Sequence, residues 1–206
     1  MHGQHTNVAG KIKVYVVGPF QAGKTTLVHS LDPKAVSIER IYKHGSTIIS
    51  TTVGFDMGRV LWLHGDEDKI IESSKLRRED LKSKNMEIWE VTLMGAPGQL
   101  HFKNVREAIA KGSDGVLFVI DSTKPGQAGY IFALLEEIRN FLGDNIPMVL
   151  IANKQDLKNA LKAERIREIL KLDGVKIIEA SAIKGEGVME GLIELLKMIR
   201  ETRLKK

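Results

Sequence analysis

One stretch near the N-terminus, "GPFQAGKTT" from Gly18 to Thr26, restricts the possible folds more than any other part of the chain. It follows the apolar run "KIKVYVVG" (Lys11–Gly18), which is typical of a buried strand. It leads into "TTLVHSL" (Thr25–Leu31), which has the period of a helix. The pattern G-x-x-x-x-G-K-[ST] places glycine where a backbone must approach a ligand closely and take unusual dihedral angles. A strand, a tight glycine loop and a helix in this order predict the first unit of a sheet with helices packed on it.

The same alternation of strands and helices continues along the chain. Further strands are expected at Phe55–Leu63, Met86–Met94, Gly115–Asp121, Pro147–Asn153 and Lys176–Ser181. Helical patterns lie at Val105–Lys111, Ile131–Leu142, Ala163–Leu170 and Val188–Arg200. Repeated strand–helix units predict an α/β fold with a mostly parallel six-stranded sheet and helices on both faces. In such sheets, ligands bind beyond the carboxyl ends of the strands.

The 206 residues fit one domain with an insertion. The segment His64–Asn85, between the second and third predicted strands, is dense in both charge signs. It is either a long hairpin or a small helical excursion, and its composition favours a solvated surface over a partner-docking element. We therefore expect a flexible tail at residues 1–10, one domain at residues 11–200 that includes this insertion at residues 64–85, and a basic tail at residues 201–206.

Composition indicates a soluble protein of the cytoplasm. The chain has no cysteine, and its net charge of +5 is spread over many stretches. No apolar run approaches the roughly 18 residues that a membrane span needs. Residue 2 is His2, not the glycine that N-myristoylation requires. The spread charge favours solubility over a specific nucleic-acid partner, and membrane contact by the basic tail is a minor alternative.

The glycine loop has the composition of a site for a nucleotide diphosphate. Its backbone N–H groups can surround the phosphates, and the helix that starts near Lys24 points its positive end at them. The Lys24 ammonium supplies charge at the β and γ oxygens, and the Thr25 hydroxyl can coordinate Mg²⁺. The nucleotide-binding residues expected here are Gly18, Gln21, Ala22, Gly23, Lys24, Thr25 and Thr26.

A second motif, "NKQD" from Asn153 to Asp156, ends a buried strand and predicts the base. The Asp156 carboxylate can accept from both the N1–H and the exocyclic N2–H₂ of guanine, whereas adenine would leave it unpaired. Asn153 can brace the loop, and the aliphatic stem of Lys154 can lie over the ring. "ASA" (Ala180–Ala182) follows the last strand, where a backbone N–H can meet the guanine O6. The guanine-side residues expected are Asn153, Lys154, Asp156, Ser181, Ala182 and Ile183.

With these motifs in this order, the chain resembles a small GTPase of the Ras superfamily, of the Arf-like and prokaryotic MglA type. "TTVGFDMG" (Thr51–Gly58) is similar to the switch I segment of Arf-type proteins, and "GAPGQ" (Gly95–Gln99) occupies the D-x-x-G-Q position of switch II. The resemblance implies a P-loop NTPase fold of the small G-domain type and a GTP/GDP molecular switch that hydrolyses GTP slowly. The site residues that it implies are Thr52 for the γ-phosphate and, with Thr25, for Mg²⁺, Gly98 for the γ-phosphate, and Gln99 as the catalytic residue that orients water.

Gly95 departs from the family pattern, in which an aspartate at this position serves the magnesium site. Glycine has no side chain that can serve the magnesium site, but Mg²⁺ keeps several waters and needs few protein ligands. Similar departures occur in MglA-type proteins, which are regarded as switches. Asp56, four residues beyond Thr52, is a candidate replacement, although we expect a surface residue at a strand edge there. Arg40 and Arg59 flank switch I and are expected at the surface rather than as catalytic arginines.

Three functions are open at this level. Gln99 and Thr52 favour a hydrolysing switch, because neither is needed merely to hold a nucleotide. Gly95 and the insertion favour a guanine-nucleotide-binding interaction module without catalysis. An ATP-dependent enzyme is the third function, and Asp156 opposes it.

Partners follow from the switch hypothesis. The γ-phosphate would order Thr52 and Gly98, so protein effectors and regulators are expected at the Val36–Gly58 and Gly98–Val105 surfaces. The resemblance also allows a small Roadblock-type protein as a partner.

Overall fold

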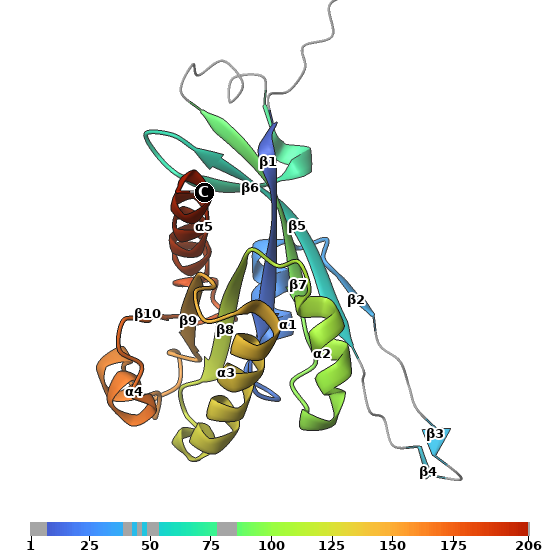
Figure 1. Cartoon of the computed structure of the whole chain (residues 1–206), viewed down its shortest axis with the longest axis vertical. Coiled ribbons are helices and arrows are strands. Elements are labelled where there is room, and N and C mark those ends of the chain that lie inside the picture. Colours follow the sequence, from blue (N-terminus) through green and yellow to red (C-terminus); the bar gives the residue numbers. More distant parts are fainter. Residues whose placement is uncertain (1–7, 39–42, 45–46, 49–53, 78–85, 206) are drawn as a thin grey trace, which may run out of the picture.

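The computed structural model describes residues 8–38, 43–44, 47–48, 54–77 and 86–205 of the chain. Within these residues a central sheet separates two layers of helices (Figure 1). A separate pair of short strands, β3 (Lys43–His44) and β4 (Thr47–Ile48), forms a small two-stranded sheet. The strands of the central sheet are β1 (Val8–Val17), β2 (Val36–Ile38), β5 (Phe55–His64), β6 (Lys69–Glu72), β7 (Glu87–Gly95), β8 (Gly115–Asp121), β9 (Met148–Asn153) and β10 (Lys176–Glu179).

The central sheet runs in the order β10-β9-β8-β1-β7-β5-β2, and β6 also pairs with β5. β1 is parallel to both of its neighbours, and β8, β9 and β10 continue the parallel arrangement. β5 is antiparallel to β7, and β2 and β6 are antiparallel to β5. The mostly parallel α/β fold is thus confirmed, but the predicted number of six strands is wrong, since the described residues form an eight-stranded sheet. Of the two missing strands, β2 has only three residues, too few to show a strand periodicity, and β6 lies within the charged segment His64–Asn85, whose composition favoured a solvated surface.

Helices cover both faces of the sheet, as expected (Figure 1). Residues 12, 14 and 16 of β1 join the core shared with α1 and α5, whereas Tyr15 and Val17 join the core shared with α2, α3 and α4. This division follows from the alternation of side chains along a strand. None of the helices in the described ranges is long and apolar enough to cross a membrane. The helices are α1 (Lys24–Leu31), α2 (Lys103–Ala110), α3 (Ala128–Leu142), α4 (Ala163–Leu170) and α5 (Val188–Leu204).

The described part of the insertion is a hairpin that belongs to the main sheet. β6 pairs with Val60–Leu63 of β5, and a single 3₁₀ turn (Ser73–Lys75) follows it. The Asp68 carboxylate, in the connection between the two strands, accepts from the Trp62 indole N–H at 3.1 Å. It also pairs with Lys197 of α5 at 3.0 Å. The hairpin is therefore tied to the domain on two sides, while residues 78–85 of the predicted insertion lie outside the described residues.

The ends of the domain differ slightly from the expected boundaries. β1 begins at Val8, inside the segment that we assigned to an N-terminal tail. α5 continues to Leu204, inside the segment that we assigned to a basic C-terminal tail. One reason is that Arg203 donates to the backbone oxygen of Lys11 and to the Asp114 carboxylate, which holds the last turn of α5 against β1.

The ion pair between Glu87 and Arg200, which joins β7 to α5, predicts a pH-dependent stability. Two Arg200 N–H groups donate to the carboxylate at 2.8 Å, and this holds the pKa of Glu87 at about 2, below its ordinary value of 4.5. A lowered carboxyl pKa stabilises the folded state above the unfolded-state pKa, and the contribution is lost as the pH falls through the folded-state pKa. Because the pair is partly exposed, we expect about 1 kcal/mol, lost between about pH 4.5 and pH 2.

Urea unfolding of wild type and Arg200→Met at about pH 6 and pH 3 checks this expectation. The gap between the two proteins should shrink at the lower pH. Arg165→Met, which breaks an exposed ion pair with Glu168 on α4, is the matched control and should show little effect at either pH. A gap of the same size at both pH values would contradict the prediction.

Candidate functional site

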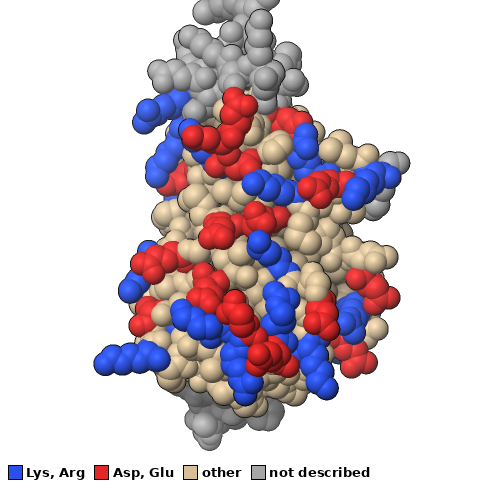
Figure 2. All heavy atoms as spheres, turned by 90° about the vertical axis from the view of Figure 1, so that its left-hand side faces the viewer, with Lys and Arg blue, Asp and Glu red and all other residues tan. Residues whose placement is uncertain are grey.

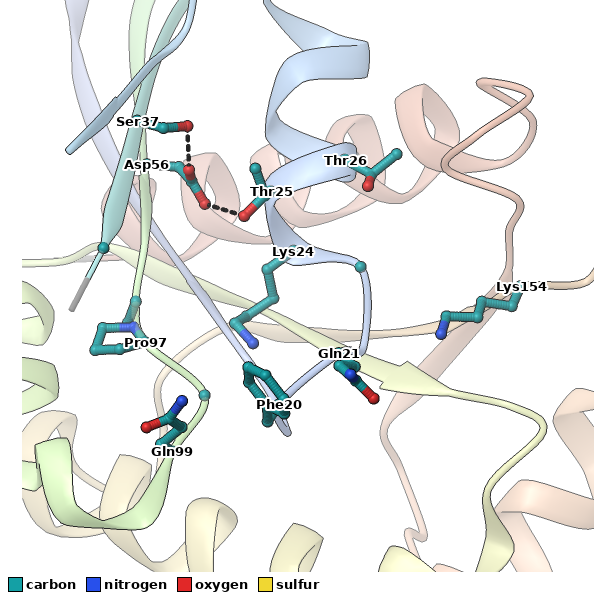
Figure 3. A pocket seen from close by; sticks show the side chains of 14 residues that line it. Phe20, Gln21, Lys24, Thr25, Thr26, Ser37, Asp56, Pro97, Gln99 and Lys154 are labelled. Atoms are coloured by element: carbon teal, nitrogen blue, oxygen red, sulfur yellow. Dashed lines mark hydrogen bonds between the residues drawn. The ribbon is translucent and has the colours of Figure 1, made fainter. Parts of the chain in front are cut away.

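A pocket of about 440 Å³ lies at one end of the sheet, beside the loop that follows β1 (Figure 3). Its lining comes from four parts of the chain that are far apart in the sequence. These are the glycine loop with the start of α1, the strands β2 and β5, the segment after β7, and the loop after β9. The lining residues are Phe20, Gln21, Gly23, Lys24, Thr25, Thr26, Ser37, Gly54, Asp56, Ala96, Pro97, Gly98, Gln99 and Lys154.

The glycine loop has the geometry of an anion cradle. Gly23 has a φ of +96°, and a Cβ added there would lie 2.3 Å from the Asn153 amide nitrogen, so only glycine fits. Lys24 lies in the first turn of α1 and is buried, and its ammonium donates to the backbone oxygens of Gly18 and Pro19 at 2.9 and 2.8 Å. Burial lowers the pKa of Lys24 to about 8, against the opposing charge of Asp56. A bound phosphate would supply the negative charge that this buried ammonium favours.

Asn153 connects the loop to the two motifs on the base side. Its amide nitrogen donates to the backbone oxygen of Ala22 at 2.8 Å, and its amide oxygen accepts from the backbone N–H of Ala182 at 2.9 Å. Asn153 ends β9 and is buried, as a brace between three loops must be. The structure thus brings the "NKQD" and "ASA" motifs to the same end of the sheet as the glycine loop.

The side chains beyond Asn153 form the far end of the site. The Asp156 carboxylate is exposed, and it accepts from the buried Ser181 hydroxyl at 2.7 Å, which orients it. The Lys154 ammonium pairs with Asp121 at 2.7 Å, and this pair, against the cost of burial, lowers the pKa of Asp121. Asp121 ends the buried strand β8 and was not assigned a role from the sequence, although its place at a strand end was a signal. Ile183, in the loop after β10, is 77% exposed.

The segment Gly95–Gln99 is held by a buried arginine that the sequence did not single out. Arg106 of α2 is fully buried and donates to the backbone oxygens of Pro97, Gln99 and Leu100. Its other N–H groups donate to both carboxylate oxygens of Glu137 on α3, at 2.8 and 2.9 Å. The Tyr130 hydroxyl, also from α3, donates to the backbone oxygen of Gly98. Four consecutive carbonyls are therefore fixed from α2 and α3.

This anchoring places the segment directly on the glycine loop. A Cβ added at Gly98 would lie 2.6 Å from both the Lys24 ammonium nitrogen and the Phe20 backbone nitrogen, so a larger residue would collide. The Gln99 side chain is half-buried and lines the pocket (Figure 3). An anion bound by the Lys24 ammonium would therefore lie close to Gly98 and Gln99.

Asp56 contradicts our expectation of a surface residue. It is 8% exposed, and its carboxylate accepts from the Thr25 hydroxyl at 2.8 Å and from the Ser37 hydroxyl at 2.6 Å (Figure 3). The expectation failed because β2, which covers Asp56, was not predicted, so β5 was taken as the edge of the sheet.

The other switch I residues are only partly described. Thr52 and Arg40 lie outside the described residues. Arg59 is exposed, as expected, and its backbone N–H donates to the Asp32 carboxylate at 2.8 Å. Among the described residues, no group of three or more histidine, aspartate or glutamate side chains is placed to hold a metal.

Together, the strand–loop–helix cradle and the brace to a second strand end define a P-loop nucleotide-binding domain. A sequence model of the Ras family matches residues 67–201, which is more than half of the chain. The chain therefore belongs to the Ras family, as a small GTPase of the Arf-like and MglA type. Members of this family hydrolyse GTP and switch between GTP-bound and GDP-bound states, and the chain is a switch of this kind.

Individual relatives extend the similarity to nearly the whole chain. ADP-ribosylation factor-like protein 6 of Danio rerio is 26% identical over 201 residues, which cover 92% of this chain and 89% of that protein. ADP-ribosylation factor-like protein 3 of Chlamydomonas reinhardtii is 27% identical over 197 residues, covering 93% and 92%. The mutual gliding-motility protein MglA of Myxococcus xanthus (strain DK1622) is 35% identical over 120 residues, covering 55% and 60%.

Proposed function

We propose that the pocket binds GTP and GDP with Mg²⁺, that Gln99 is the catalytic residue for slow GTP hydrolysis, and that the protein works in the cytoplasm. The observation that supports this most is the shape of the pocket. It runs from the glycine loop to Lys154 and has the segment 96–99 as one wall, so that one bound molecule would touch all of them (Figure 3).

The proposed placement of the nucleotide follows from the donors and acceptors. The phosphates lie on the backbone N–H groups of the loop and on Lys24, and the base lies between Lys154 and Asp156. Asp156 accepts from the guanine N1–H and N2–H₂, and the Ser181 hydroxyl orients the carboxylate by donating one hydrogen bond to its Oδ1. The nucleotide-binding residues proposed are Gly18, Gln21, Ala22, Gly23, Lys24, Thr25, Thr26, Gly98, Asn153, Lys154, Asp156, Ser181, Ala182 and Ile183.

For hydrolysis, the segment after β7 supplies the protein groups. The Gly98 N–H meets the γ-phosphate, and the Gln99 side chain orients a water toward it. The carbonyls of both residues are already held by Tyr130 and Arg106, so little backbone freedom remains to be lost when the transition state forms.

Magnesium fits the donor set of the site. The Thr25 hydroxyl and the Asp56 carboxylate are 2.8 Å apart at the edge of the pocket, and both are the hard oxygen ligands that Mg²⁺ prefers. Thr25 would bind the metal directly, joined by Thr52 in the GTP-bound state. When bound, magnesium neutralises charge on the β- and γ-phosphate oxygens.

Partners are proposed at surfaces beside the pocket. Val36 and Ile38 of the edge strand β2 are 52% and 42% exposed, and Leu100 after Gln99 is 56% exposed. These apolar side chains flank the two segments that a γ-phosphate would reorder, which suits protein effectors and regulators, a Roadblock-type protein among them. Figure 2 shows lysine and arginine mixed with aspartate and glutamate over one side of the molecule, and such a surface does not favour nucleic acid.

Single-turnover hydrolysis tests the proposed function. Purified protein loaded with labelled GTP and Mg²⁺ should release phosphate slowly, and Gln99→Leu should lower the rate about tenfold or more, because leucine cannot orient water. Asn140→Leu, on an exposed position of α3, adds a leucine elsewhere and should leave the rate unchanged. Equal, background-level rates for wild type and Gln99→Leu would instead indicate a binding module without catalysis.

A further inference from the structure

Asp56 and Gly95 are direct neighbours across the sheet. In the antiparallel pair formed by β5 and β7, Asp56 lies opposite Gly95. Side chains that face each other in this way leave the same face of the sheet about 5 Å apart. A carboxylate at either position would therefore reach the same end of the pocket, beside Thr25.

The space between the two strands holds one side chain. A Cβ added at Gly95 would lie 3.1 Å from both the Cβ and the Oδ2 of Asp56, which is tighter than ordinary contact. Gly95 does not have a positive φ, so its backbone conformation is open to any residue. Since Gly95 is also buried, the side-chain volume of Asp56 is the feature that explains a glycine at this position.

The contacts of Asp56 are those of a carboxylate that serves a cation site. One oxygen accepts from Thr25 at 2.8 Å and the other from Ser37 at 2.6 Å. Ser37 in turn is 3.0 Å from the His29 ring nitrogen. Within the described residues, no lysine or arginine is in direct ion-pair contact with Asp56, although the carboxylate is buried and interacts electrostatically with the nearby Lys24 ammonium. A buried carboxylate with hydroxyl donors and no cation in direct contact suits a site that is completed by a metal.

We infer that Asp56 supplies, from β5, the carboxylate that orders Thr25 and the magnesium site, and that it does so in place of the aspartate that the family pattern has across the strand pair at position 95. This inference rests on the proposed function, because it concerns the metal of the same nucleotide pocket. Asp56 acts through Thr25 and through water, as a positioning residue. Groups that orient a metal ligand in this way change metal affinity by about 10- to 100-fold when they are removed.

Retention of a fluorescent GDP tests the inference without using hydrolysis. The rate at which the protein releases N-methylanthraniloyl-GDP is followed over a range of free Mg²⁺ and in EDTA. Asp56→Asn keeps the shape of the side chain but removes its charge. We expect it to raise the Mg²⁺ concentration needed for half-maximal retention about 10-fold or more, with little change of the release rate in EDTA. Asp144→Asn, in the exposed turn after α3, is the matched control and should behave as wild type.

The reciprocal exchange is the decisive variant. Gly95→Asp alone places two carboxylates in the space of one and should lower the melting temperature. The double variant Asp56→Gly with Gly95→Asp has the same composition and net charge as wild type. It should bring the Mg²⁺ midpoint back to within about threefold of wild type and regain most of the lost thermal stability.

The outcomes separate this inference from the proposed function. If wild type fails to bind the fluorescent GDP, the proposed function is wrong. If wild type binds it with a clear Mg²⁺ dependence, and Asp56→Asn changes neither the midpoint nor the shape of the curve of retention against Mg²⁺ concentration, Asp56 does not serve the metal. Faster release by Asp56→Asn in EDTA, by the same factor as in Mg²⁺, would show a role in folding the pocket and would also overturn the inference.

Discussion

Replacing Asp156 with asparagine should weaken GDP binding roughly a thousandfold and create binding of xanthosine diphosphate. The wild-type carboxylate accepts two hydrogen bonds from guanine, and each bond to a charged group is worth about 1.5–3 kcal/mol. An asparagine offers one acceptor and one donor. Guanine then meets an amide N–H₂ where it needs an acceptor, whereas xanthine has a carbonyl oxygen at C2 and an N1–H that match the amide.

Calorimetric titration of wild type and of Asp156→Asn, each with GDP and with xanthosine diphosphate, measures this change of base preference. Asp173→Asn, an exposed position after α4, is the control and should bind GDP as wild type does. The Ser181 hydroxyl, which donates to Asp156 at 2.7 Å, remains available to orient the new amide oxygen, so the fold of the loop should be kept. Unchanged preference for GDP over xanthosine diphosphate in Asp156→Asn would mean that the base lies elsewhere.

Replacing Arg106 with methionine should destabilise the protein by about 3–5 kcal/mol, because the partner carboxylate of Glu137 is then left without its cation. Arg106 is fully buried, and the same substitution also frees three backbone oxygens of the segment 97–100. Urea unfolding of the GDP-bound protein gives the free energy of unfolding. Arg139→Met removes an exposed arginine from α3 and should change it by less than about 0.5 kcal/mol.

The double variant Arg106→Met with Glu137→Leu tests the cause of that loss. It replaces the pair by apolar side chains of similar size and should recover much of the stability. It would not restore the hydrogen bonds to the segment 97–100, so GTP hydrolysis should stay slower than in wild type. A double variant as unstable as Arg106→Met alone would show that the carbonyl contacts, rather than the stranded carboxylate, account for the effect.

The sequence predicted the fold well where the signal is local. Six strands, five helices and the glycine loop were all expected close to where the structure has them, because each has its own periodicity or motif. The strand ends that carry Asn153 and Ser181 could also be placed, since parallel strands end at the same edge.

The parts that failed depend on contacts between distant residues. Arg106 sits in a charged helical pattern, where an arginine is ordinarily solvated, and only its contacts with α3 and with residues 97–100 show otherwise. Asp56 was misplaced because β2 is three residues long and its pairing with β5 leaves no periodic trace in the sequence. The proximity of Asp56 to Gly95 comes from the register of β5 against β7, which neither motif alone specifies.

The pairing of β2 with β5 has a consequence for regulation. Asp56 is bonded across the sheet to Ser37 on the outermost strand, where Val36 and Ile38 are exposed. A protein that docks on this edge would therefore contact β2, the strand whose Ser37 donates to the Asp56 carboxylate. If binding of such a protein changes the affinity of the site for the cation by some factor, then binding of the cation must change the affinity for that protein by the same factor. An exchange factor could on this basis loosen the nucleotide from the outside of the sheet, without ever entering the cleft.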